Sequence, residues 1–453
     1  METMEQKILA KVEEKKEKTI ELLAKLVRIP SPTGEEAAAQ VFIAEYLNRL
    51  GLSLDCWEPD VKALFKKYPH VAQYPSHWQH DLILPYQNLP TYKELIETGK
   101  VEVLNYKDRQ NVVGTWKGSG NGGKSLILNG HIDTVTVEPV NEWTHDPYGA
   151  EIIEGKMFGR GVSDMKSGIV TSLIALECLI ELGVKLRGDV IFQSVVNEEH
   201  AGNGTLACIE RGITADAAII TEPTKHDIRL GSAGSVCWGV EIAGRSRPTG
   251  ARWAGQEQNG ISAIEKIPCI IDSLLAMEQK INRDCRHPHL PEQNPFSLVM
   301  GRVRGGHYDG VTASECVLNG TAYFGSEAGS VLEIMEHIRN AVSEGSKADP
   351  WLMEVPPNVF FLHHDDPSDI DVNEPIIQTL SVAAEKVLGK KPLRYRGTAA
   401  CDMRHLINQG NIPTTVFGPG WGDQIHKPDE FMPIDSMLPA VKTLALTIFK
   451  WCS

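Results

Sequence analysis

Short apolar runs alternate with helical segments in the middle of the chain, and several runs end on an acidic residue or a histidine. The strand-like runs are NVVGTW (111–116), SLILNGHID (125–133), DVIFQSVVNEE (189–199) and AAIITEPT (217–224), and the helical segment SGIVTSLIALECLIELG (167–183) lies among them. This alternation predicts an α/β domain with a mostly parallel central sheet. In such sheets functional groups gather at the carboxyl ends of the strands, so we expect the site there.

The chain has 453 residues, whereas single cores stop growing at roughly 250 to 300 residues. Between residues 231 and 365 the order changes to strand, helix, strand, strand, helix, which is typical of a split β-α-β domain. From Asn373 the helix IIQTLSVAAEKVLG and the strand TTVFGPG resume the first pattern. We therefore predict a catalytic domain made of residues 1–230 and 366–453, with an inserted α+β domain over residues 231–365.

Two further segments complete the predicted organisation. Apolar residues recur at helical spacing from Ile8 to Val27, which predicts one amphipathic helix that ends before Pro30. Residues 60–105 are rich in Tyr, Pro, His and Trp and have no sustained period, so we expect a surface insertion.

Net charge and cysteine content limit the binding partners and the cellular compartment that we expect. The formal net charge of −14 opposes binding to nucleic acid or to an anionic membrane surface. The nine cysteines have no paired spacing, which favours a reducing compartment over a disulfide framework. No signal-like or membrane-spanning apolar stretch is visible. We expect a cytoplasmic protein that acts on a small molecule.

Residues 118–125, GSGNGGKS, match the phosphate-binding pattern GxxxxGK[ST]. A true phosphate loop follows a strand and opens a helix, so that backbone amides face the phosphates. Here the residues after Ser125 are LILNGHID, which is a strand pattern. We interpret the segment as the turn of a β-hairpin and not as a nucleotide site.

Acidic and imidazole side chains collect at the predicted strand ends. Dinuclear hydrolytic sites need carboxylate and imidazole ligands, a carboxylate that bridges the metals, and an unliganded carboxylate that takes a proton from water. Side chains alternate along a strand, so His131 and Asp133 lie on one side of theirs. The adjacent residues Glu198 and Glu199 point in opposite directions for the same reason. The candidates are His131, Asp133, Asp164, Glu198, Glu199, Glu222 and His426.

Five segments closely resemble the M20 family of metallopeptidases and deacylases, which includes acetylornithine deacetylase and succinyl-diaminopimelate desuccinylase. They are LNGHIDTV, WTHDPYGAEIIEGKMFGRGVSDMKSG, SVVNEEHAGNGT, ITEPT and GPGWGDQIHKPDEF. The resemblance implies a zinc-peptidase-like catalytic domain and an inserted lid that pairs subunits into a homodimer or a higher oligomer. It also makes Glu198 the general base and Asp133 the residue that supports a ligand histidine.

The same resemblance implies two divalent metal ions per chain, either zinc, cobalt or manganese. Carried over by matching residues, one ion would be bound by His131 and Glu222. The other would be bound by Glu199 and His426, and Asp164 would bridge the two ions.

The inserted domain departs from the family pattern. Pro248 stands where relatives usually have a lid histidine in a GRxxHxG run, and Thr321 stands where an arginine is frequent. The segment 308–313 also lacks the usual polar residue before Val/Ile-Pro. Neighbouring groups are candidates to take over substrate binding: Arg245, Arg247, Arg252 and His307.

The leading hypothesis is a dinuclear metal-dependent hydrolase that cleaves an amide or related C–N bond of a small molecule, as an N-acyl amino acid deacylase or an aminohydrolase. A hydrolytic deaminase of a small aromatic amine is the alternative, which the altered lid favours. A non-catalytic metal-binding scaffold is a second alternative. The substrate, the native metal and the oligomer size stay open.

Overall fold

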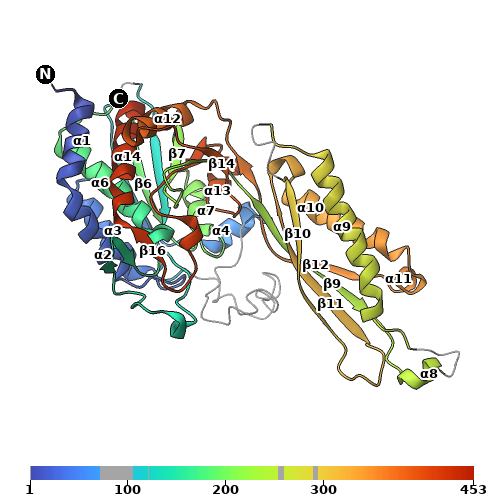
Figure 1. Cartoon of the computed structure of the whole chain (residues 1–453). Helices are drawn as coiled ribbons and strands as arrows, with labels where there is room; N and C mark the ends of the chain where they lie inside the picture. The colour runs from blue at the N-terminus through green and yellow to red at the C-terminus, as the bar shows by residue number, and fades with distance from the viewer. Residues whose placement is uncertain (1, 72–105, 121, 254–259, 289–293) are drawn as a thin grey trace. The chain divides into compact units, whose positions relative to one another are not determined.

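The computed structural model describes residues 2–71, 106–120, 122–253, 260–288 and 294–453, and it divides into two compact units (Figure 1). Unit 1 comprises Met1–Gly231, Asp369–Tyr395 and Cys401–Ser453, and unit 2 comprises Ser232–Ser368 and Arg396–Ala400. Residues 366–368 and 396–400 thus group with unit 2, beyond the limits predicted for the insertion. Within the described ranges, no helix combines the length and apolar character needed to cross a membrane.

Unit 1 is built on a nine-stranded mixed sheet. Along the main path the strands are β1 (Ser53–Trp57), β2 (Asn111–Trp116), β6 (Val190–Val195), β3 (Leu126–His131), β7 (Ala217–Ile220), β15 (Thr414–Val416), β8 (Ile228–Ser232) and β13 (Ser368–Asp369), and β14 (Arg394–Arg396) pairs with β8. The pairs β6–β3, β3–β7 and β7–β15 are parallel, whereas β1–β2, β2–β6 and β15–β8 are antiparallel. The α/β prediction is confirmed, with the parallel part confined to the centre.

The predicted hairpin between β2 and β3 is wrong, because β6 lies between these two strands. Every residue of β3 is buried, so this strand needs a neighbour on each side and cannot end a sheet. The segment after β2 is instead tied beside β6, where the Asp189 carboxylate accepts a hydrogen bond from the backbone N–H of Gly118 at 2.9 Å.

Helices cover this sheet. They are α1 (Met4–Glu14), α2 (Lys16–Val27), α3 (Ala37–Arg49), α4 (Val61–Lys67), α6 (Ser167–Glu181), α7 (Asn203–Glu210), α12 (Pro375–Leu388), α13 (Met403–Asn408) and α14 (Met437–Cys452). Helices α1 and α14 pack beside α6, which is buried almost all round (Figure 1). The single helix predicted over 8–27 is divided at Lys15, whose Nζ lies 2.5 Å from carboxylate oxygens of Glu177 and Glu181. Of the predicted insertion, residues 72–105 lie outside the described part of the chain.

A small three-stranded sheet completes unit 1. It contains β4 (Glu151–Ile153), β5 (Lys156–Phe158) and β16 (Phe431–Pro433), in the order β16-β5-β4. It joins the chain just before Asp164 to the chain just after His426.

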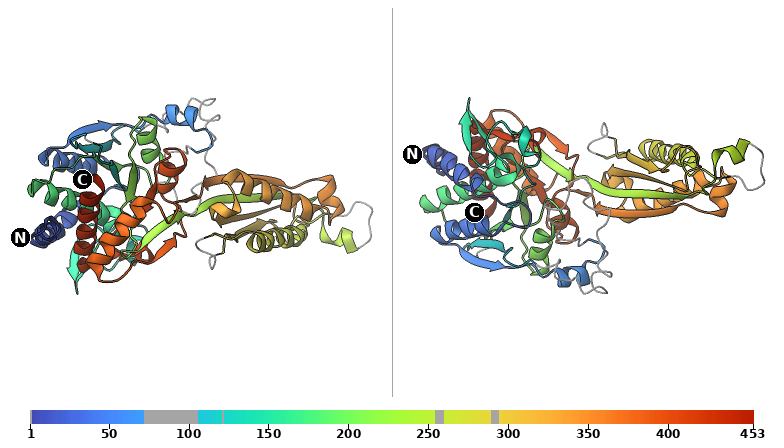
Figure 2. Two further views of the ribbon diagram at one scale, coloured as in Figure 1. Left: turned by 90° about the horizontal axis from the view of Figure 1, so that it is seen from above. Right: turned by 90° about the horizontal axis from the view of Figure 1, so that it is seen from below.

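Unit 2 is an α+β unit with a four-stranded antiparallel sheet (Figure 2). The strand order is β10 (Phe296–Gly305), β11 (Glu315–Phe324), β9 (Gly234–Ala243) and β12 (Asn358–Asp365). Helices α9 (Ile267–Asp284) and α10 (Val331–Ser346) pack on each other and on this sheet. The short helix α11 (Pro350–Glu354) adds Leu352 to their core, whereas the short helix α8 (Thr249–Trp253) contributes no described residue to it.

The edges of this sheet are β10 and β12, so the expectation that SVCWGVEIAG forms an edge strand is wrong. Strand β9 carries Val236, Trp238, Val240 and Ile242, all fully buried, and hydrogen bonds to β11 on one side and β12 on the other. Because β9 is paired on both sides, it is not an edge that could extend the sheet into a neighbouring subunit.

Candidate metal centre

Three parallel neighbours of the central sheet deliver most of the predicted ligands. His131 ends β3, Glu198 and Glu199 follow β6, and Glu222 follows β7. Because β6, β3 and β7 are adjacent and parallel, their carboxyl ends meet at one edge. Asp164 lies in the short segment between β5 and α6 that reaches the same edge.

Asp164 stands between two imidazoles. Its Oδ1 is 3.1 Å from Nε2 of His131, and its Oδ2 is 3.1 Å from Nε2 of His426. Glu222 Oε1 lies 3.3 Å from His131 Nε2, and Glu199 Oε2 lies 3.0 Å from His426 Nε2. The structure thus brings five predicted ligands together as two sets that meet at Asp164.

Glu198 belongs to the His131 side of this cluster. Its Oε2 lies 3.8 Å from His131 Nε2, and it forms a compact donor group with His131 and Glu222. A second donor group of the described residues contains His131, Asp164 and Glu199. Glu199 thus lies within reach of both imidazoles and has its short contact with His426, whereas Glu198 lies on the His131 side.

Asp133 has a wider role than the sequence indicates. Its backbone oxygen lies 2.9 Å from Nδ1 of His131, whereas its carboxylate oxygen is 3.7 Å from that nitrogen. The carboxylate instead accepts hydrogen bonds from the backbone N–H groups of Glu198 (3.0 Å) and Glu199 (3.2 Å) and from the Thr33 hydroxyl (2.8 Å). Asp133 thus orients the imidazole through its backbone and both glutamates through its side chain.

The close approach of these groups perturbs their proton affinities. Burial raises the pKa of Glu222 to about 7 and raises the pKa of Glu198 well above its usual range. Burial lowers the pKa of His131, but the nearby carboxylates outweigh this and leave it well above normal. The Glu199 carboxylate is the largest of the causes that raise the pKa of His426 to about 12. This pattern indicates an excess of negative charge, which cations would balance.

Glu430 is a buried residue that the sequence did not single out. Its Oε1 accepts hydrogen bonds from the backbone N–H groups of Ser163 (2.9 Å) and Asp164 (3.2 Å). Its Oε2 accepts from the backbone N–H of Gly161 (3.1 Å) and from the Arg160 guanidinium (2.7 Å). The segment that carries Asp164 is therefore held by a carboxylate four residues after His426.

Lys166 was also missed. Its side chain is fully buried, and its Nζ donates hydrogen bonds to the carbonyl oxygens of Leu26 (3.2 Å) and Ile29 (2.8 Å). This contact fixes the other end of the Asp164 segment to the end of α2. The sequence around it, GVSDMKSG, is polar and carries no signal that this lysine is buried.

The predicted substrate-binding residues lie in unit 2. The Arg245 guanidinium is 4.9 Å from the Trp351 ring centroid, and Arg247 donates a hydrogen bond to the backbone oxygen of Ser246 at 2.8 Å. His307 is exposed. The side chain of Arg252 lies outside the described residues. The structure does not join these residues into one cluster, and their role in substrate binding stays a prediction.

Comparison with known proteins decides the family. A model of peptidase family M20/M25/M40 matches residues 127–450. The chain belongs to this family. The predicted recognition is thereby confirmed, and this M20 chain is a metal-dependent amidohydrolase.

Individual relatives align with nearly the whole length of this M20 chain. It is 30% identical to the N-formyl-4-amino-5-aminomethyl-2-methylpyrimidine deformylase of Halalkalibacterium halodurans, over 99% of this chain and 97% of that protein. Aminopeptidase PepT from Bacillus cereus has a similar fold, with a TM-score of 0.68 and 18% identity over 97% of this chain and 99% of that chain. A dinuclear metal binding peptidase of the M20 family from Bacillus subtilis has a TM-score of 0.61 and 15% identity, over 97% and 99% of the two chains.

Proposed function

We propose that the chain hydrolyses the N-formyl or another short N-acyl amide of an aminomethyl-substituted aromatic heterocycle, with two divalent cations bound at the centre. The observation that carries this proposal is the position of Asp164, whose two carboxylate oxygens each face a different imidazole. The substrate class is supported by the deformylase relative, which aligns with 99% of this chain.

The donor set fits two divalent cations. Imidazole nitrogens and carboxylate oxygens are ligands that zinc, cobalt and manganese accept in proteins. His131 and Glu222 would hold one cation, Glu199 and His426 the other, and Asp164 would contact both. Bound cations would polarise the amide carbonyl and make water more acidic.

Glu198 would move the proton. It would accept a proton from the attacking water and deliver it to the amine nitrogen as the C–N bond breaks. Its side chain is only 12% exposed and lies beside the His131 set, whereas Glu199 faces His426. The hydrogen bond from the backbone N–H of Glu198 to the Asp133 carboxylate would hold the backbone that carries this side chain.

The lid residues support a substrate without an α-carboxylate. Burying a carboxylate without a cationic or hydrogen-bonding partner costs several kcal/mol. Pro248 has no donor, and the Thr321 hydroxyl lies near Cys237, with Oγ1 and Sγ 3.7 Å apart. A formamide on a neutral ring carries no carboxylate and therefore needs no cationic partner in the lid.

We also propose the location, the metals and the assembly of this protein. The nine cysteines are all free thiols, which suits the cytoplasm. Zinc, cobalt and manganese are the candidate metals, and a homodimer or higher oligomer is the candidate assembly.

Steady-state kinetics with the metal-loaded enzyme tests the proposal. We expect formate release from N-formyl-4-amino-5-aminomethyl-2-methylpyrimidine, with kcat/KM at least about a thousandfold above that for N-acetylornithine and N-succinyl-diaminopimelate, as a difference of about 4 kcal/mol requires. Equal or better turnover of the two amino acid derivatives would overturn the substrate class. Ammonia release in place of formate would identify the deaminase alternative.

A further inference from the structure

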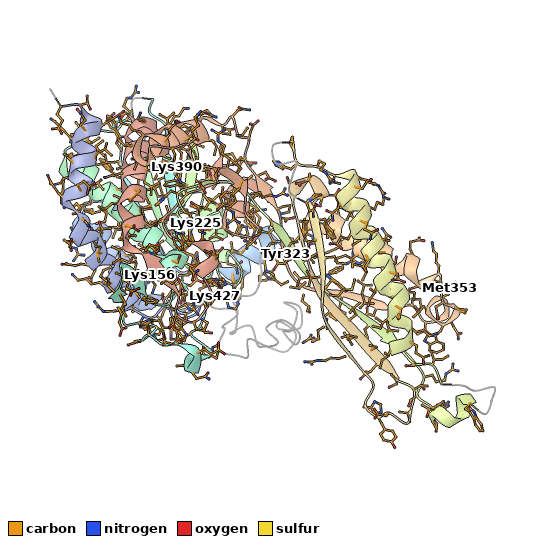
Figure 3. All side chains as sticks on the ribbon, in the orientation of Figure 1. Lys156, Lys225, Tyr323, Met353, Lys390 and Lys427 are labelled. Atoms are coloured by element: carbon orange, nitrogen blue, oxygen red, sulfur yellow. The ribbon has the colours of Figure 1, made fainter. Side chains whose placement is uncertain are left out.

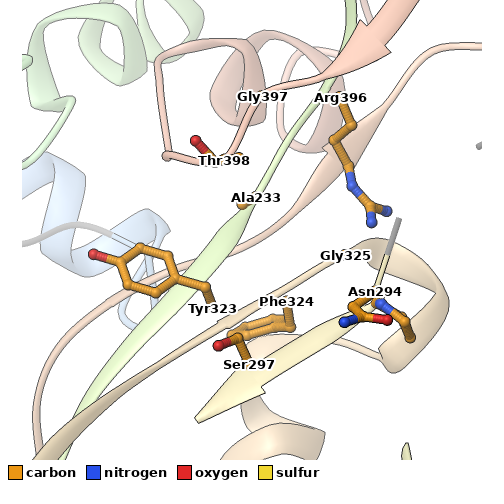
Figure 4. A pocket seen from close by; sticks show the side chains of 10 residues that line it. Ala233, Asn294, Ser297, Tyr323, Phe324, Gly325, Arg396, Gly397 and Thr398 are labelled. Atoms are coloured by element: carbon orange, nitrogen blue, oxygen red, sulfur yellow. The ribbon is translucent and has the colours of Figure 1, made fainter. Parts of the chain in front are cut away.

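Unit 2 contains a cavity of about 410 Å³ that no part of the proposed chemistry uses (Figure 4). It is formed by the start of β10, the end of β11 and the segment that follows β14. Its volume lies in the range of small-molecule pockets, about 300 to 1,000 Å³. The side chains that define its chemistry are Asn294, Ser297, Tyr323, Phe324, Arg396 and Thr398.

Arg396, which lines this cavity, belongs to a buried ion pair. The Arg396 side chain is 5% exposed and donates to the Glu327 carboxylate, which is 9% exposed. Gly325 lies against both groups, and a Cβ atom there would overlap the Arg396 guanidinium and the Glu327 carboxylate. The backbone is therefore shaped around a fixed, oriented guanidinium.

The remaining wall combines aromatic surface with polar groups. Ser297 and Tyr323 are directly opposite each other in the β10–β11 pair, so their side chains stand on the same face. Tyr323, labelled in Figure 3, is 43% exposed and offers part of its ring to a ligand. The Thr398 hydroxyl, above Tyr323 in Figure 4, and the Asn294 amide, on the side of Arg396, add donors and acceptors.

Charge selects the kind of ligand. Arg396 is the cationic side chain among the described lining residues, and Glu327 already balances its charge. A second anion would have to share the guanidinium with that carboxylate, which like-charge repulsion opposes. A neutral ring with nitrogen acceptors instead uses guanidinium, amide and hydroxyl donors and stacks on an aromatic side chain.

We propose that this cavity is a binding site for a neutral aminopyrimidine ring. The choice of pyrimidine among heteroaromatic rings rests on the proposed function. The cavity supplies an aromatic face, hydrogen-bond donors at its wall and a balanced charge, and this combination recognises the amino and ring-nitrogen edge of the base.

Binding of 4-amino-2,5-dimethylpyrimidine to the metal-loaded full-length protein tests the proposal by calorimetry. This probe has no amide bond, so its binding is measured independently of hydrolysis. Ser297→Trp fills the cavity from an exposed position, and Tyr323→Ala removes the stacking face. Val303→Trp is the matched control, because Val303 is exposed on the same strand and does not line the cavity.

We expect the dissociation constant of the probe to rise about tenfold in Tyr323→Ala and more in Ser297→Trp, with no change in Val303→Trp. Failure of the probe to bind, or equal affinity in the wild type and both cavity variants, would overturn the proposal. Displacement of the probe by succinate would also overturn it, because the cavity would then be an anion site. If the probe binds as expected but no formate is released from the formylated compound, the proposed function fails and the binding site stands.

Discussion

Removal of the Glu430 carboxylate should be one of the most damaging single changes in unit 1. Its side chain is 1% exposed, and its partner Arg160 is 2% exposed. In Glu430→Ala the guanidinium would stay buried without its carboxylate, and three backbone N–H groups would lose their acceptor. Breaking a buried ion pair from one side costs about 3 to 5 kcal/mol. We therefore expect the free energy of unfolding of this unit to fall by that amount.

The assay is urea unfolding of metal-stripped full-length protein, following the transition that contains unit 1. Asp55→Ala is the matched control, because Asp55 and Arg211 form an ion pair in the same unit whose side chains are 44% and 43% exposed. An exposed pair contributes only about 0.2 to 1 kcal/mol. If Glu430→Ala costs no more than Asp55→Ala, the view that Glu430 holds the Asp164 segment is refuted. The same variant should bind its metals about 10 to 100 times more weakly, which elemental analysis after dialysis can detect.

Three further outcomes are expected. Glu198→Gln should keep both metals and lose about 10² to 10⁴ in kcat, while Glu21→Gln, at an exposed helix position, should change neither; near wild-type turnover would contradict the proton-transfer role. A chelator should abolish turnover and lower the melting temperature, because the carboxylates of Asp164 and Glu199 then lack cations between them; reloading should yield two ions per chain, and one or none would contradict the dinuclear centre. Light scattering at micromolar concentration should find at least a dimer, and a monomer would refute association through unit 2.

The ligands at strand ends could be predicted because each follows directly after an apolar run of the sequence. A strand of the sequence LILNGH that is buried throughout must lie inside a sheet, and its histidine then falls at the carboxyl edge. The same argument applies to the glutamates after β6 and β7. Parallel neighbours bring these three strand ends together, whereas Asp164 and His426 lie between strands and helices and were assigned to the site only by the resemblance to the M20 family.

Strand partners and supporting residues could not be predicted in the same way. The glycine-rich segment 117–125 can turn back toward β2 or pass beyond β6, and its composition does not distinguish the two paths. Glu430 contacts the backbone of Asp164 across 266 residues of sequence, so its role exists only after folding. The break at Lys15 coincides with contacts to carboxylates on α6, which a periodic pattern within residues 8–27 does not contain.

The metal centre is assembled from distant parts of the chain, and this determines when it can exist during synthesis. His131, Asp164, Glu199 and Glu222 leave the ribosome about 200 or more residues before His426 and Glu430. Domains fold as their segments emerge, from the N-terminal side onward. A growing chain therefore presents an acidic cluster that still lacks one imidazole and the carboxylate that holds Asp164. A chain truncated just before residue 426 would keep the central strands β6, β3 and β7 in its sequence, but it would lose His426, Glu430 and the buried helix α14 and could not complete the centre.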